Sequence, residues 1–307
     1  MPWHAALERQ LNLTLQEGFP LASLTTWEAG GTAEFLLAPR NTDQARGAFA
    51  FCRTAGVPVW TIGGGSNVLV HPQGLEGMTL WMAEMKGFSL VRGPEGSCLI
   101  EADAGCPTRR LLNFCLSNGF SGLEFATGIH GSIGGALVCN AGAGPEAMGS
   151  VVEWVESVEA DGTTMRWKGT EIHSGYRYSS LASEPRLVTR CGLRVAEMDK
   201  AIVRNRVLDF WSRRKGQPHG AKTAGCVFKN PGFGNEPAGL LLDRCGCKGM
   251  AIGDAVVSRL HANFIENRGK ATAGQIWELI RLCRKKVFDA SGVWLELEVT
   301  LLGGPWD

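Results

Sequence analysis

Short alternating runs of hydrophobic and polar residues, separated by stretches with helical spacing, fill the first two-thirds of the chain. The sequence Asn41-Thr42-Asp43-Gln44 is typical of a helix start, and the helix it predicts runs to about Thr54. A second helix is predicted from Thr108 to Ser117, ended by Asn118-Gly119. Apolar runs predict short strands at residues 57–62, 68–70, 78–82 and 98–102, the last three at a spacing that favours hairpins.

Two alternating runs, 152–160 and 163–167, flank Asp161-Gly162 and predict a β-hairpin. In the last third, helices are predicted from Lys200 to Arg214 and from Thr272 to Ala290, the second opening on the capping-box spacing Thr272-x-x-Gln275. A final alternating run, 293–302, predicts a closing strand. This mixture indicates an α+β fold with several domains and a boundary near residue 199.

Charge and cysteine content exclude several classes of protein. The 307 residues carry 31 basic and 30 acidic side chains, a balance that gives no electrostatic footprint for nucleic acid or an anionic membrane. No leader signature opens the chain and no apolar segment is long enough to span a membrane, so we expect a soluble, cytoplasmic protein. The ten cysteines are scattered without a C-x-x-C pair, so we expect free thiols and no metal site.

Glycine is over-represented, with 41 residues or about 13 %, against a usual value of about 7 %. One glycine run, Gly63-Gly64-Gly65-Ser66-Asn67, lies between two apolar strands and could turn its backbone N–H groups toward a phosphate. It is not a Walker A loop, and Val68 occupies the third glycine position of the Rossmann fingerprint. Taken alone, this run fits a simple strand connection equally well.

A second glycine-rich run is Gly128-Ile-His-Gly131-Ser132-Ile-Gly134-Gly135-Ala136, followed by Asn140-Ala141-Gly142. Tight packing of a helix on a strand also favours small residues. However, two such runs within 80 residues, each mixing glycine with Ser or Asn donors, favour a dinucleotide held mostly by main-chain groups.

These motifs resemble the UDP-N-acetylenolpyruvoylglucosamine reductase family, the flavoenzymes known as MurB. Further matches follow in the family's order: Thr25-Thr26-Trp27 with Gly30-Gly31, Tyr176-Arg177-Tyr178-Ser179, Ala224-Gly225-Cys226-Val227-Phe228-Lys229-Asn230-Pro231, His261-Ala262-Asn263-Phe264-Ile265 and Leu295-Glu296-Leu297-Glu298-Val299. The resemblance covers residues from about 24 to the C-terminal strand and indicates the shorter subclass, which lacks a tyrosine-bearing insertion.

The resemblance implies a two-part FAD-binding module of the vanillyl-alcohol-oxidase (PCMH-type) kind and a separate α+β substrate-binding domain. We expect FAD-binding subdomain 1 at residues 1–76, joined by the C-terminal strand at 293–307, and FAD-binding subdomain 2 at residues 77–198. The substrate-binding domain is expected at residues 199–292.

The family's reaction would be the NADPH- and FAD-dependent reduction of UDP-N-acetylglucosamine enolpyruvate to UDP-N-acetylmuramate, in peptidoglycan precursor synthesis. Hydride from flavin N5 would add to the vinyl carbon, leaving an enolate that needs a cationic partner and a proton donor. The resemblance assigns Arg177 to the substrate carboxylate, Glu298 to enolate stabilisation and Cys226 to proton donation. Glu296 then reads as a solvated strand residue.

For the ligands, the resemblance assigns two sets of residues. The cofactor-binding set is Gly63, Gly64, Gly65, Ser66, Asn67, Gly128, Gly131, Ser132, Gly134, Gly135, Asn140, Ala141 and Gly142. The substrate-binding set is Tyr176, Lys229, Asn230, His261 and Asn263, of which His261 and Asn263 either line the substrate site or order it from behind.

Three positions depart from the family pattern. Cys226 stands where the family most often has Ser; because a thiol, with a reference pKa of about 8.5, is more acidic than an alcohol, we keep the proton-donor role, with a buried structural cysteine as the alternative. Gly216 stands where a Lys usually precedes Gln-Pro, which weakens any assignment of a phosphate lysine. His130 replaces a usual Pro, and we interpret it as a loop substitution, so that FAD binds non-covalently.

Two other functions are compatible with parts of the sequence. One is a different FAD-dependent oxidase or dehydrogenase on the same scaffold, against which the motifs after residue 199 argue. The other is a non-catalytic nucleotide-sugar binding protein, suggested only by the change from Ser to Cys at position 226. We also expect a monomer.

Overall fold

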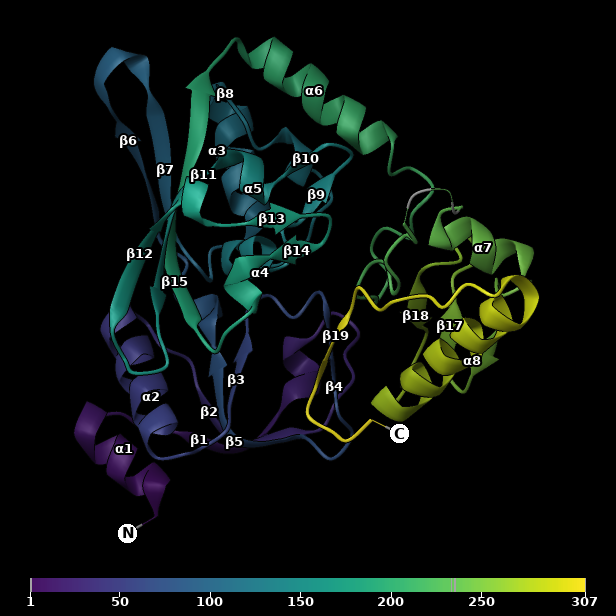
Figure 1. The fold of residues 1–307 in the computed structure, drawn as a ribbon, viewed down its shortest axis with the longest axis horizontal. Helices are drawn as coiled ribbons and strands as arrows, with labels where there is room; N and C mark the ends of the chain where they lie inside the picture. The colour runs from purple at the N-terminus through teal and green to yellow at the C-terminus, as the bar shows by residue number, and fades with distance from the viewer. Residues whose placement is uncertain (1, 233, 235, 307) are drawn as a thin grey trace. The chain divides into compact units, whose positions relative to one another are not determined.

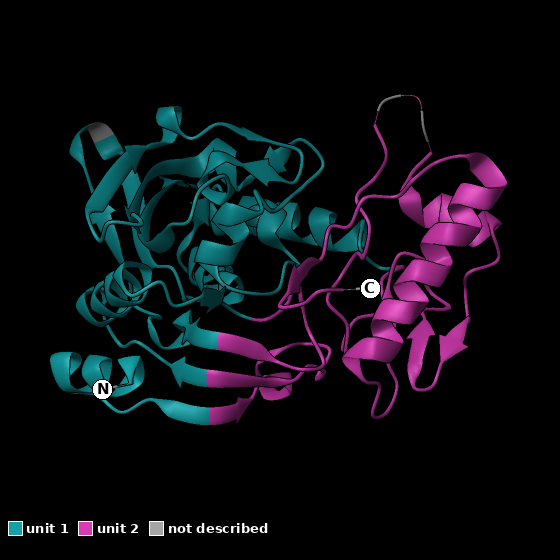
Figure 2. Ribbon diagram, turned by 60° about the horizontal axis from the view of Figure 1, so that its bottom comes forward, with its two compact units in different colours: residues 1–17, 35–64, 77–215 teal, residues 18–34, 65–76, 216–307 magenta. Residues whose placement is uncertain are grey.

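The computed structural model describes residues 2–232, 234 and 236–306. By its internal contacts the chain divides into two compact units, each made of three segments (Figure 2). Unit 1 contains residues 1–17, 35–64 and 77–215, and unit 2 contains residues 18–34, 65–76 and 216–307. Both units contain helices and strands, and the predicted α+β class is confirmed.

Unit 1 contains an antiparallel sheet (Figure 1). Its strands lie in the order β12 (Thr164–Lys168), β11 (Val152–Val158), β15 (Leu187–Glu197), β7 (Cys98–Asp103) and β6 (Phe88–Arg92), and β8 (Phe120–Ser121) pairs with the end of β15. Helices α3 (Thr108–Asn118), α4 (Ile133–Val138) and α6 (Lys200–Ser212) share a buried core with this sheet. Apolar residues on the inner side of each element hold them together.

A second sheet has the order β1 (Gln16–Pro20), β2 (Thr32–Leu37), β5 (Leu75–Trp81) and β3 (Val59–Ile62), with β3 and β5 parallel. Helices α1 (Trp3–Leu11) and α2 (Thr42–Thr54) bury Leu7 and Ala48 in one core with Met78 and Leu80. The predicted cap of α2 is confirmed, because the Asn41 side chain accepts a hydrogen bond from the N–H of Gln44 at 2.9 Å.

In unit 2 a small antiparallel sheet has the order β16 (Ala251–Ile252), β17 (Ala255–Val257) and β18 (Ile265–Asn267). Helices α7 (Ala238–Arg244) and α8 (Ala273–Ser291) share its buried core. The predicted capping box is present at the start of α8, where the side chains of Thr272 and Gln275 each bond the other residue's N–H. The C-terminal strand β19 (Thr300–Leu302) pairs in parallel with β4 (Val68–Val70).

Two predictions about strands are wrong. The expected closing strand 293–302 is regular only in β19, with one isolated bridge at Leu297, because the residues before it pair with irregular segments. The runs 68–70, 78–82 and 98–102 do not form hairpins with one another; β4 pairs with β19, β5 with β3, and β7 with β6 and β15. The hairpin formed by β11 and β12 is confirmed.

Unit 1 also contains short elements near the end of α4. These are β9 (Gly142–Ala143), β10 (Glu146–Ala147), α5 (Met148–Val151), β13 (Ser174–Gly175) and β14 (Tyr178–Ser179). None of the helices in the described residues has the length and apolar character that a membrane crossing requires.

Candidate active site

The two predicted glycine loops touch each other within unit 1. The first follows β3, and the second leads into α4. A Cβ atom on Gly64 would lie 2.6 Å from the Cα of Gly131, and one on Gly63 would collide with the hydroxyl of Ser132. Glycine at position 64 permits this approach of two backbones, and glycine at position 63 leaves room for the Ser132 side chain. The sequence runs that predicted a shared ligand are therefore neighbours in space.

The start of α4 is held by the segment after β7. The N–H groups of Ile133 and Gly134 donate to the carbonyls of Cys106 and Ala104 at 2.9 and 2.7 Å. A Cβ on Gly134 would lie 2.8 Å from that of Ala104, so close packing already requires a small residue there. By contrast, a Cβ on Gly135 would lie 3.5 Å from the Ser132 hydroxyl, an ordinary contact distance. Gly134 thus fixes the position of the second loop.

The rest of the first loop belongs to unit 2, where it meets the C-terminal segment. The carbonyl of Gly65 accepts the N–H of Thr26 at 3.0 Å. The Asn67 side chain donates to the carbonyl of Glu298 at 3.0 Å, and its own carbonyl accepts the N–H of Thr300 at the same distance. Asn67 therefore fixes the backbone of the segment that carries Glu298.

Arg177 lies in the turn between β13 and β14, in unit 1. It is half-buried and has a φ of 51°, in the left-handed region that residues other than glycine seldom adopt. Its Nη1 donates to the carbonyl of Gly142 at 3.4 Å, and its guanidinium carbon lies 5.3 Å from the ring centroid of Tyr176. The Tyr176 side chain is exposed, so this turn presents an aromatic ring and a cation together.

Cys226 and Glu298 lie on adjacent backbone segments of unit 2. The carbonyl of Val227, next to Cys226, accepts the N–H of Glu298 at 2.8 Å, and Phe228 forms a bridge with Leu297. Cys226 itself forms an isolated bridge with Phe264. Both Cys226 and Glu298 are half-buried. The structure therefore brings together two of the three predicted catalytic residues at the level of the backbone.

The Asn263 side chain bonds both the N–H and the carbonyl of Phe228, in the segment that follows Cys226. It is 3 % exposed, and its amide accepts the N–H of Phe228 at 2.9 Å and donates to the carbonyl of the same residue at 2.8 Å. Its backbone carbonyl also accepts the N–H of Val227 at 2.9 Å. The amide predicted to contact substrate is thus occupied by the protein backbone.

The remaining predicted substrate residues differ in their exposure and partners. Lys229 forms an ion pair with Glu296 at 3.6 Å, and the Glu296 side chain is 75 % exposed. The side-chain oxygen of Asn230 accepts the N–H of Ala238, at the start of α7, at 3.0 Å. His261 accepts the N–H of Asn263 on Nδ1 at 3.3 Å. Burial lowers the pKa of His261 below its ordinary value, and the nearby Lys248 lowers it further.

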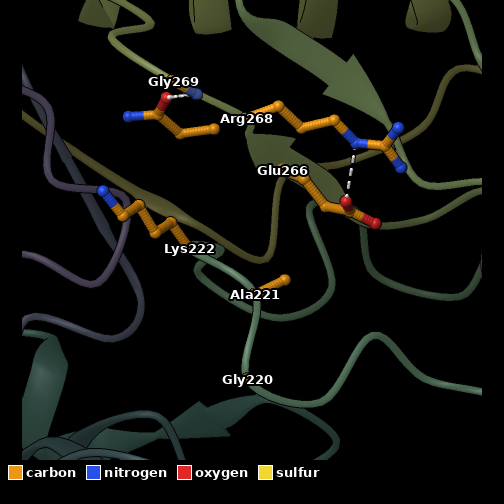
Figure 3. A pocket seen from close by; sticks show the side chains of 7 residues that line it. Gly220, Ala221, Lys222, Glu266, Arg268 and Gly269 are labelled. Atoms are coloured by element: carbon orange, nitrogen blue, oxygen red, sulfur yellow. Dashed lines mark hydrogen bonds and ion pairs between the residues drawn. The ribbon is translucent and has the colours of Figure 1, made fainter.

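A cavity of about 290 Å³ that the sequence did not indicate lies in unit 2 (Figure 3). Its lining includes Lys222, Glu266 and Arg268, with Asn267 and nearby glycines. Each cation faces a carboxylate: Arg268 pairs with Glu266 at 3.0 Å, and Lys222 pairs with Glu28 at 2.5 Å. The lining carries two cations and one carboxylate and includes none of the predicted site residues.

In the part of the chain that the structure describes, the cysteines and acidic residues form no metal-binding cluster. No disulfide joins any of the ten cysteines, and Cys226 is one of three that are only half-buried. Among residues 2–232, 234 and 236–306, no group of three His, Cys, Asp or Glu side chains is arranged to hold a metal ion.

Comparison with known proteins accounts for nearly the whole chain. Residues 33–168 match the model of an FAD binding domain, and residues 217–302 match that of the UDP-N-acetylenolpyruvoylglucosamine reductase C-terminal domain. The UDP-N-acetylenolpyruvoylglucosamine reductase of Synechococcus sp. strain JA-3-3Ab is 37 % identical over 98 % of this chain and 95 % of its own length. That of Heliobacterium modesticaldum is 38 % identical over 92 % and 89 %.

A solved structure agrees with these relatives. The crystal structure of UDP-N-acetylenolpyruvylglucosamine reductase (MurB) from Thermus caldophilus is 32 % identical and covers 94 % of this chain and 99 % of its own, with a TM-score of 0.80. The resemblance inferred from the ordered motifs is thereby confirmed. The chain belongs to the UDP-N-acetylenolpyruvoylglucosamine reductase family.

Proposed function

We propose that this protein reduces UDP-N-acetylglucosamine enolpyruvate to UDP-N-acetylmuramate, with FAD as cofactor and NADPH as reductant, in peptidoglycan precursor synthesis. The observation that carries the proposal is the match to named reductases at 37–38 % identity over 92–98 % of the chain. The models of an FAD binding domain and of the reductase C-terminal domain both match this chain, at residues 33–168 and 217–302.

The glycine loops of unit 1 fit FAD. Gly64 is in direct backbone contact with Gly131 and Ser132, so the two runs meet with few side chains between them, and such loops suit a flat nucleotide held by main-chain groups. We propose that the runs 63–67 and 128–135 hold the cofactor. When bound, FAD supplies the hydride chemistry, being reduced by NADPH and then reducing the enolpyruvyl double bond.

Arg177 would bind the substrate carboxylate. A guanidinium pairs with a carboxylate through a planar fork and keeps its charge as negative charge develops on the neighbouring carbon. The position of Arg177 in a fixed turn, with its Nη1 already bonded to the carbonyl of Gly142, supports a preorganised cation. We propose that Glu298 is the second group that orders the enolate.

Cys226 would hold the proton that the enolate receives. We propose that its Sγ–H protonates the carbon next to the carboxylate after hydride addition, and that Asn263 keeps the thiol in place through Phe228. Tyr176 and Lys229 would contact the substrate. Asn230 and His261 also belong to this set, and their observed bonds support an ordering role within it.

We further propose that the ranges 1–76 with 293–307, and 77–198, act as the FAD-binding subdomains and that 199–292 acts on the substrate. The match at 33–168 lies within the two proposed FAD-binding ranges, and the match at 217–302 covers most of the proposed substrate range and part of the C-terminal segment. That the protein acts as a monomer and in the cytoplasm remains a prediction from the sequence.

A single assay tests the proposed reaction. The purified protein should be yellow and should oxidise more than one equivalent of NADPH per flavin only when the enolpyruvyl substrate is present. Oxygen-dependent turnover of another donor would indicate an oxidase instead, and colourless protein that binds a UDP-sugar would indicate a binding protein.

The role of Cys226 is tested by separating the two half-reactions in rapid mixing. Cys226→Ala should leave reduction of the flavin by NADPH unchanged and slow its reoxidation by the enolpyruvyl substrate by about 10²- to 10⁴-fold, the usual contribution of general acid catalysis. Cys226→Ser, which restores a proton-bearing oxygen, should recover part of the rate. Parent rates in both half-reactions of Cys226→Ala would exclude this role.

A further inference from the structure

The turn that carries Arg177 has little support of its own. Strands β13 and β14 are two residues each, paired through Ser174 with Ser179 and Gly175 with Tyr178. Tyr176 and Arg177 form the connection, and Arg177 has the left-handed φ of 51°. A two-residue ladder does not hold such a turn in water, so neighbouring segments must fix it.

Asn140 is the residue that ties this hairpin to the rest of unit 1. It follows α4, is 6 % exposed and has a φ of 43°. Its Nδ2 donates to the carbonyl of Gly175 at 2.7 Å, two residues before Arg177, and its Oδ1 accepts the N–H of Gly149 in α5 at 2.8 Å. One amide therefore joins the end of α4, the short helix α5 and the first strand of the hairpin.

The same segment also holds the guanidinium. Gly142, two residues after Asn140, offers its carbonyl to Nη1 of Arg177 at 3.4 Å. Gly149 allows the close approach, because a Cβ there would collide with the hydroxyl of Ser174 and lie 3.2 Å from Oδ1 of Asn140. The backbone and the side chain of Arg177 are thus both fixed by residues 140–149.

We propose that Asn140 is a positioning residue for Arg177, and that the Asn140-Ala141-Gly142 motif serves the substrate carboxylate site through it. Both polar ends of the Asn140 amide are bonded to backbone groups, Nδ2 to the hairpin and Oδ1 to α5. The catalytic part of this inference rests on the proposed role of Arg177, whereas the ordering of the hairpin does not.

Asn140→Asp is the discriminating substitution. It keeps the oxygen that accepts the N–H of Gly149, and it replaces the nitrogen that donates to Gly175 by an oxygen that faces a carbonyl. The substitution therefore breaks the bond to the hairpin and keeps the bond to α5. Asn118→Asp is the matched control, because Asn118 makes the same kind of bond to the carbonyl of Phe114 at 2.8 Å on the exposed end of α3.

Hydrogen exchange tests the ordering independently of activity. In the FAD-loaded enzyme, Asn140→Asp should raise exchange at residues 174–179 by about tenfold, the effect of losing one hydrogen bond that supports a locally opening unit. Exchange in β7 and β15 should stay at the parent rate, and Asn118→Asp should change neither region. Unchanged exchange at 174–179 would overturn the proposal whatever reaction the enzyme performs.

Half-reactions and a double substitution test the catalytic part. Asn140→Asp should retain the flavin content and the rate of reduction by NADPH, and slow reoxidation by the enolpyruvyl substrate by about 10²-fold. In an Arg177→Ala background, Asn140→Asp should slow reoxidation little further, because both substitutions act through the same guanidinium. A full additive loss, or a loss of flavin, would mean that Asn140 serves the cofactor and would overturn the inference. If the proposed function itself is wrong, the parent enzyme will not turn over this substrate. The hydrogen-exchange result would still hold in that case, because it does not depend on the reaction.

Discussion

The imidazole of His261 links pH to the order of the Cys226 segment. Burial lowers its pKa below the ordinary value of about 6.5, so the folded protein holds it neutral with Nδ1 accepting from Asn263. Because the folded pKa lies below the unfolded one, the unfolded chain takes up the proton first as the pH falls. The stability that this group contributes is complete above about pH 6.5 and is lost as the pH drops through the folded pKa.

We therefore expect the melting temperature of the parent to fall between pH 7 and pH 5 partly through His261. His261→Gln, which does not titrate, should show a shallower decline over the same range. His173→Gln replaces an exposed histidine of unit 1 and should follow the parent. Parallel curves for the parent and His261→Gln, measured by thermal unfolding at half-unit pH steps, would contradict this assignment.

Single residues also show what the sequence could and could not reveal. The motifs identified Asn67, Asn140 and Asn263 as site residues, but their amides bond backbone groups of Glu298, Gly175 and Phe228. These partners lie 231, 35 and 35 residues away along the chain, so no local pattern indicates them. The sequence motifs therefore identified these three residues, but only the structure showed which groups they contact.

Among the elements, the glycine loops give the sharpest prediction. Gly64 has no left-handed φ, so its need for glycine comes only from contact with the backbone at Gly131, whose Cα would lie 2.6 Å from a Cβ on residue 64. We expect Gly64→Ala to lower the free energy of unfolding by about 1–3 kcal/mol, the usual cost of overpacking, and to lower FAD content. Gly216→Ala, where a Cβ meets nothing within 4 Å, should stay within about 0.5 kcal/mol of the parent. Urea unfolding and flavin absorbance measure both effects, and equal values for the two variants would contradict the argument.

Elements whose signals are local were predicted well. The Asn41 cap of α2, the Gly119 exit of α3 and the capping box of α8 are confirmed, because each depends on groups within four residues. The closing strand was not, since only Thr300–Leu302 finds a regular partner, in β4. Which strands pair depends on residues that are distant along the chain, so the alternation of apolar and polar residues within one strand does not identify its partner.

At the scale of the whole molecule, the ordered motifs identified the family, but the interleaving of the two units was not visible in the sequence. Residues 18–34 and 65–76 are grouped with 216–307, some 150 to 200 residues later. The reason is burial: Trp27 and Leu69 are fully buried in the core of unit 2. The apolar character of a residue predicts that it will be buried, but it does not predict which core of the protein will bury it.

This interleaving predicts that residues 216–307 do not fold alone, although 217–302 match a family domain. Trp27 donates from Nε1 to the carbonyl of Ile265 at 2.8 Å, and its own carbonyl accepts from Asn267 at 2.8 Å. Without it, a buried carbonyl and a buried amide lose partners, at about 1–3 kcal/mol each, and the core loses a large side chain, at about 3–5 kcal/mol. Strand β19 would also lose β4.

These losses match the whole stability of a typical domain, about 5–15 kcal/mol, so we expect residues 216–307 alone to show no cooperative unfolding by circular dichroism. Trp27→Ala in the full chain should still fold, with the free energy of unfolding reduced by about 3–5 kcal/mol. A sigmoidal transition of the isolated segment, with the steep denaturant dependence of a native domain, would show that unit 2 needs no N-terminal residues.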